Sequence, residues 1–157
     1  MSPHAFRAQL LRFDADGQPL YDEDGLLVTA TDAQGVRRVL DAGPFGALRE
    51  RHAQVPLTHW PGRLIAPGFI DMHVHYPQLD VIGAPADGLL PWLEHYTFPA
   101  ESRFADPEHA AEVAGFFFDE LQRNGVTTAL TFATSHPASV DAFFGQAQRR
   151  GLRMIGG

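Results

Sequence analysis

The order of hydrophobic patterns in the second half of the chain constrains its fold more strongly than any other feature. An apolar run at 69–75 is followed, after a longer segment, by an amphipathic helical pattern at 107–124 and a β-branched run at 126–134. A second helical pattern at 139–150 leads to a short strand-like run at 152–155. Strand, helix, strand, helix, strand is the order of parallel βαβ units. We therefore predict an α/β fold with a parallel sheet covered by helices.

Both expected helices carry start and stop signals. Asp106 is a candidate N-cap, Pro107 suits the first helical position, and Gly125 provides a C-terminal stop. For the second helix, Ser139 is a candidate N-cap and Gly151 a stop.

The first part of the chain has a different pattern. Residues 1–65 contain short strand-like runs separated by turn sequences such as DADG and DAQG. We expect a small β-rich unit there and a second unit at 66–157.

Composition excludes several classes of function. The net charge is −7 and all 12 basic residues are scattered arginines, so we expect no nucleic-acid partner. The chain has no cysteine, which excludes disulfides, thiolate nucleophiles and cysteine-ligated zinc. No run is long and apolar enough to span a bilayer, and the N-terminus does not resemble a signal peptide. We expect no membrane partner and a cytoplasmic location.

The run at 69–75 carries two histidines one residue apart. Side chains alternate between faces along a strand, which predicts one face with Phe69, Asp71, His73 and His75. The other face, which we expect helices to cover, carries Ile70, Met72 and Val74.

His73 and His75 are candidate metal ligands. Their positions lie about 6.6 Å apart along a strand, so both imidazoles can lean onto one ion. Chemistry in parallel α/β folds collects at the carboxyl ends of strands, where this pair lies. Asp71, deeper on the same face, is a candidate for orienting a metal-binding histidine through a hydrogen bond. The spacing alone is equally compatible with ordinary polar residues on a half-exposed strand.

Two further polar residues have alternative interpretations. The Gln78 carboxamide has the donors and acceptor that pair with a purine edge, but a loop glutamine on the surface is an equally simple interpretation. His136 follows the second strand, where it either faces the mouth of a site or caps the following helix.

Three segments together resemble a known family. The segment PGFIDMHVHYPQ, with His-x-His-x-x-Gln at 73, 75 and 78, resembles the first barrel strand of the amidohydrolase superfamily. The segments LLPWLEHYTFPAESRF at 89–104 and NGVTTALTFATSHPAS at 124–139 resemble its guanine deaminase branch. The resemblance implies a TIM-like (β/α)8 barrel preceded by a small β-sandwich segment. A complete barrel needs about 250 residues, so we expect an incomplete barrel here, with 66–157 as its first βα units.

The resemblance also implies a site. It places zinc on His73 and His75, and substrate contacts on His75, Tyr76, Pro77 and Gln78, with Gln78 bonded to the purine. The family's other metal ligands, its proton-shuttling glutamate and its arginine-phenylalanine pair have no counterpart here, so we expect no catalytic residue in this chain.

The implied activity is zinc-dependent hydrolytic deamination of guanine to xanthine and ammonia, a step of purine catabolism, by a full-length homodimer. Two alternatives remain open. The chain alone could be a non-catalytic truncated remnant, since two histidines rarely hold zinc tightly. The substrate could also be another amino-purine, a triazine or a pyrimidine.

Overall fold

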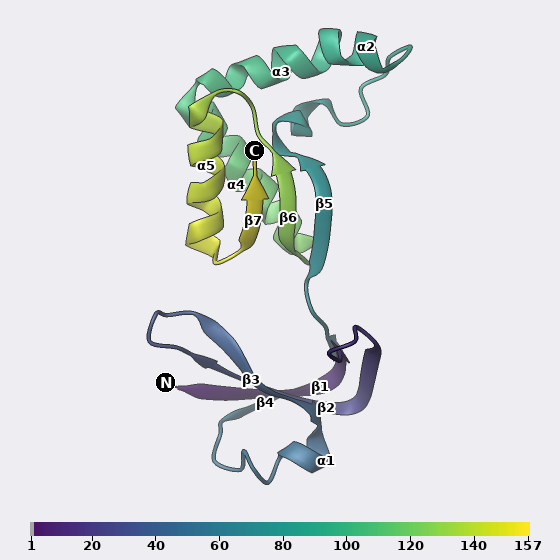
Figure 1. Cartoon of the computed structure of the whole chain (residues 1–157), viewed down its shortest axis with the longest axis vertical. Coiled ribbons are helices and arrows are strands. Elements are labelled where there is room, and N and C mark those ends of the chain that lie inside the picture. The colour runs from purple at the N-terminus through teal and green to yellow at the C-terminus, as the bar shows by residue number, and fades with distance from the viewer. Residues whose placement is uncertain (1) are drawn as a thin grey trace. The chain divides into compact units, whose positions relative to one another are not determined.

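The computed structural model describes residues 2–157 and divides the chain into two compact units, Met1–Pro67 and Gly68–Gly157 (Figure 1). Within residues 2–157, no helix combines the length and the apolar character needed to cross a bilayer.

The first unit is a four-stranded sheet with one short helix. Its elements are β1 (Pro3–Phe13), β2 (Pro19–Thr31), β3 (Arg37–Pro44), α1 (Phe45–Leu48) and β4 (Leu57–Ile65). The strand order is β3-β2-β1-β4; the β1–β4 pair is parallel and the other two pairs are antiparallel. Its small buried core consists of Ala5, Leu26, Val28 and Leu48.

The second unit has the predicted βαβαβ order. A parallel sheet, ordered β5-β6-β7, is formed by β5 (Phe69–His75), β6 (Val126–Phe132) and β7 (Arg153–Gly156). The connecting helices α4 (Pro107–Arg123) and α5 (Pro137–Arg150) pack against each other beside the sheet (Figure 1). The prediction of an α/β unit with a parallel sheet is confirmed.

The segment between β5 and α4 is almost entirely helical, which the sequence patterns did not show. It contains η1 (Tyr76–Val81), α2 (Leu89–Trp92), η2 (Leu93–Thr97), α3 (Phe98–Ser102) and η3 (Arg103–Ala105). Figure 1 shows α2 and α3 along one helical stretch above the carboxyl ends of the strands.

One predicted N-cap is confirmed and one is wrong. The Asp106 carboxylate accepts a 2.9 Å hydrogen bond from the backbone of Glu108, as expected for the start of α4. The N-cap of the second helix is His136, three residues earlier than the predicted Ser139, and Pro137 takes the first helical position, where no backbone N–H is needed. Ser139 is therefore inside α5, buried, with its hydroxyl bonded to the carbonyl of His136 at 2.8 Å.

The expected helix cover over β5 is wrong for two of its three apolar residues. Ile70 and Met72 are 65% and 66% exposed, and only Val74 packs against the buried cluster of the second unit. The reason is the position of β5 at the edge of the sheet, where the cluster reaches only the carboxyl end of the strand.

Candidate metal and substrate site

The two histidines of β5 bring their rings together at the carboxyl end of the strand. His73 Nε2 and His75 Nε2 lie 3.2 Å apart. Two nitrogens at this separation, each about 2.05 Å from one ion, subtend about 103° at that ion, close to a tetrahedral angle. The pair therefore fits two positions of a zinc site. Within residues 2–157, no third histidine or carboxylate joins it to complete a set of ligands.

Phe132 forms the wall behind both imidazoles. It is the last residue of β6 and lies opposite His75 in the sheet. Its ring centroid is 4.9 Å from that of His73 and 4.6 Å from that of His75, with the His75 ring stacked on it. Sequence reasoning missed this residue, although its place at the end of the neighbouring strand could have indicated it. The aromatic ring restricts the positions that the two imidazoles can take.

The surroundings of His75 favour its neutral form. Burial lowers the pKa of His75, the nearby His73 lowers this pKa further, and Glu101 opposes the change. Neutral imidazole is the form that binds a metal ion.

Asp71 acts on the strand backbone rather than on an imidazole ring. Its Oδ1 accepts a 3.0 Å hydrogen bond from the backbone N–H of His73. At this point the pairing of β5 with β6 is irregular, because three residue steps from Asp71 to Val74 match two on β6. The carboxylate thus stabilises the irregular backbone that leads into the histidine pair.

Tyr76 and Pro77 lie in the core rather than at a ligand. Both are buried, and the Tyr76 ring packs among Phe104, Phe117 and Phe143. The Tyr76 hydroxyl donates a 2.5 Å hydrogen bond to the backbone carbonyl of Ser139. The 3-10 turn η1 directs both side chains inward, where they anchor the segment, and a contact of Tyr76 and Pro77 with a substrate stays a prediction.

Gln78 turns back toward the histidine pair. Its amide nitrogen is 3.2 Å from His75 Nδ1 and 3.1 Å from Glu101 Oε1. Glu101 is on α3, and sequence reasoning did not identify it because it lies 23 residues away along the chain. Glu101 lines a pocket of about 210 Å³ together with His136. His136 is the N-cap residue of α5, and its side chain makes no capping hydrogen bond.

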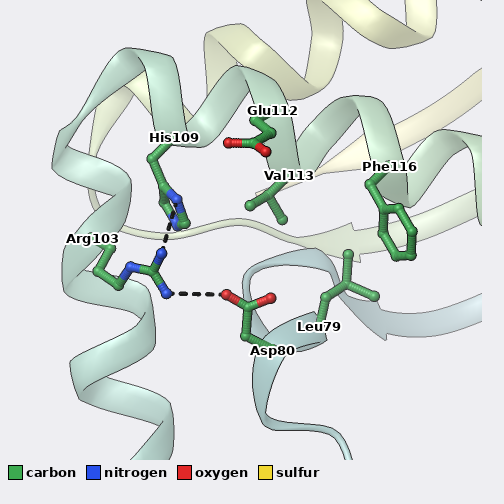
Figure 2. Close-up of a pocket in the computed structure, with 7 residues that line it drawn as sticks. All are labelled: Leu79, Asp80, Arg103, His109, Glu112, Val113 and Phe116. Carbon is green, nitrogen blue, oxygen red and sulfur yellow. Dashed lines mark hydrogen bonds and ion pairs between the residues drawn. The ribbon is translucent and has the colours of Figure 1, made fainter.

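A second pocket of about 290 Å³ lies between η1, η3 and α4 (Figure 2). Figure 2 shows Arg103 between Asp80, at 3.0 Å, and His109, at 3.3 Å. Asp80 belongs to η1, so this ion pair ties the segment carrying Gln78 to η3. Because Arg103 is bonded to both Asp80 and His109, we interpret this pocket as a structural contact rather than a reactive site.

The chain is similar to known proteins in both its sequence and its fold. The sequence model of the Amidohydrolase family matches residues 64–157. The chain is 48% identical to the guanine deaminase of Escherichia coli strain K12 over 117 residues, or 72% of this chain and 27% of that protein.

Solved structures of similar proteins have the same fold. The guanine deaminase from Bradyrhizobium japonicum superposes with a TM-score of 0.91 at 32% identity, covering 100% of this chain and 35% of the other. The guanine deaminase from C. acetobutylicum, solved with guanine bound in its active site, has a TM-score of 0.84 at 26% identity over 99% of this chain and 36% of the other. The chain thus spans roughly a quarter to a third of these relatives.

Proposed function

Since the chain belongs to the amidohydrolase family, we propose that it forms part of a zinc-dependent guanine deaminase. The reaction is hydrolysis of the exocyclic C–N bond of guanine, which consumes water and yields xanthine and ammonia. The observation that carries this proposal is the joint placement of His73, His75 and Gln78 at the carboxyl end of β5. Their geometry supports two histidine ligands for one metal ion, beside a carboxamide that can hydrogen-bond a purine.

Each residue has a defined role in this proposal. His73 and His75 hold the ion through their Nε2 atoms, while Phe132 and Asp71 restrict the rings and the backbone. The chemistry supplied by a bound zinc ion is Lewis-acid activation of water near neutral pH. Gln78 hydrogen-bonds the purine edge and so orients the base.

The proposal extends to the architecture. Three parallel strands with two packed helices are what the start of a TIM-like (β/α)8 barrel requires, and we assign residues 66–157 to such a barrel. Residues 1–65 are assigned to a β-sandwich segment. Homodimerisation and a cytoplasmic location stay predictions; light scattering on the purified protein tests the first.

The test uses protein expressed from the complete reading frame. We expect ammonia and xanthine from guanine, and bound zinc by elemental analysis. His73→Ala and His75→Ala should lower zinc content and reduce turnover at least 100-fold, since each removes a metal ligand. His95→Ala is the matched control, because His95 is exposed on η2. Absence of ammonia release by the unmodified protein, or full zinc content in both ligand variants, would contradict the proposal.

A further inference from the structure

We propose that Glu101 is a positioning residue that sets which end of the Gln78 carboxamide faces the substrate. This inference deepens the proposed deaminase function and rests on it. It concerns a contact between two segments, η1 and α3, that come together only in the folded chain.

The identity of the Gln78 atom that faces Glu101 follows from hydrogen-bond chemistry. The side-chain atom of Gln78 nearest Glu101 lies 3.1 Å from its Oε1. A glutamate carboxylate accepts hydrogen bonds and donates none, whereas a carboxamide has one donating and one accepting end. Only the amide nitrogen can form this contact, so Glu101 determines the orientation of the amide.

The opposite end of the amide is then free for a ligand. The Gln78 nitrogen directs its second hydrogen toward His75 Nδ1, at 3.2 Å. Within residues 2–157, the Gln78 carbonyl oxygen has no hydrogen-bond partner. A free carbonyl oxygen recognises N–H donors. Guanine carries such donors at the 2-amino group, on the carbon that loses its amine, and at N1, the ring atom beside that carbon.

Glu101 matters most when His75 holds an ion. A neutral imidazole that binds a metal through Nε2 carries its proton on Nδ1, and that atom then accepts no hydrogen bond. The contact from Gln78 to His75 is lost in this state, and the contact to Glu101 remains. Glu101 is therefore the partner that keeps the amide oriented in the loaded site.

The test compares three variants of the protein expressed from its complete reading frame. Glu101→Gln keeps the size of the side chain but can present either an oxygen or a nitrogen to Gln78. We expect the KM for guanine to rise about tenfold, the effect of one hydrogen bond to a charged group, with kcat changed less than about threefold. Glu101→Asp keeps an acceptor-only carboxylate and should restore most of the lost affinity. Glu94→Gln, an exposed change on the adjoining turn, should leave KM unchanged.

Two further measurements separate positioning from other roles. Zinc content should be equal in all three variants, because within residues 2–157 Glu101 hydrogen-bonds Gln78 and neither His73 nor His75. The side-chain amide signals of Gln78 in ¹⁵N–¹H NMR spectra should move in Glu101→Gln and stay in place in Glu94→Gln.

Specific outcomes would overturn the inference. An unchanged KM in Glu101→Gln, unmoved Gln78 signals, or loss of zinc together with activity would each refute a positioning role. If the unmodified protein releases no ammonia from guanine, the proposed function fails; the NMR comparison still decides whether Glu101 orients the amide.

Discussion

Replacing Tyr76 with phenylalanine should destabilise the second unit by about 1–2 kcal/mol, because it removes one buried hydrogen bond. Tyr76 is fully buried, and its hydroxyl lies 2.5 Å from the carbonyl oxygen of Ser139, also fully buried. The phenylalanine ring keeps the packing against Phe104 and Phe143, so no cavity adds to this cost.

Urea unfolding followed by tryptophan fluorescence measures this effect. The chain has two tryptophans, Trp60 in the first unit and Trp92 in the second, so a Trp60→Phe background makes the signal report on the second unit. With an m-value of about 2 kcal/mol/M, the midpoint should fall by roughly 0.5–1 M. Tyr21→Phe is the control, since Tyr21 is 57% exposed. A midpoint for Tyr76→Phe equal to that of the control would refute the reasoning.

Three other predictions also concern the second unit, and one of them has its control in the first unit. Burial raises the pKa of Tyr76 to about 12 from an ordinary value of 10.0, so its contribution to stability should be intact below pH 10 and lost as the pH rises through 12; ultraviolet difference titration with parallel unfolding curves tests this. Gly68→Ala puts a methyl group into the Thr127 side chain and should cost about 1–3 kcal/mol by calorimetry, whereas Gly46→Ala enters open space and should not destabilise the fold. Asp71→Ala should lower zinc affinity about tenfold in a chelator competition, and Asp71→Asn, which keeps an acceptor for the strand N–H, should retain it; equal affinities would contradict this.

The parts of the fold that were predictable are those fixed by local chemistry. Asp106 caps α4 because a carboxylate followed by proline satisfies the first turn by itself. Gly151 ends α5 with a φ of 64°, a conformation that favours glycine. Ser139 misled the prediction because serine is common at caps, and nothing local showed that its hydroxyl would be buried beneath His136.

The unpredicted parts depend on contacts between distant segments. Exposure of Ile70 follows from the position of β5 at the sheet edge, which alternation alone cannot reveal. Glu101 reaches Gln78 only after η1 and α3 have folded against each other. The pairing of His73 with His75 was foreseeable because both residues lie on one short strand.

Two buried residues lie between the partly exposed His75 and Gln78, and this order has an evolutionary consequence. The two groups that would meet a ligand are separated by two residues locked in the core, and one of these is held by a backbone carbonyl of α5. A substitution in α5 changes a side chain and leaves the backbone carbonyl in place. The spacing between the His75 imidazole and the Gln78 carboxamide should therefore tolerate mutations in the side chains of α5. Selection for a new substrate can alter Gln78 or its partner Glu101 without moving the two metal-binding histidines.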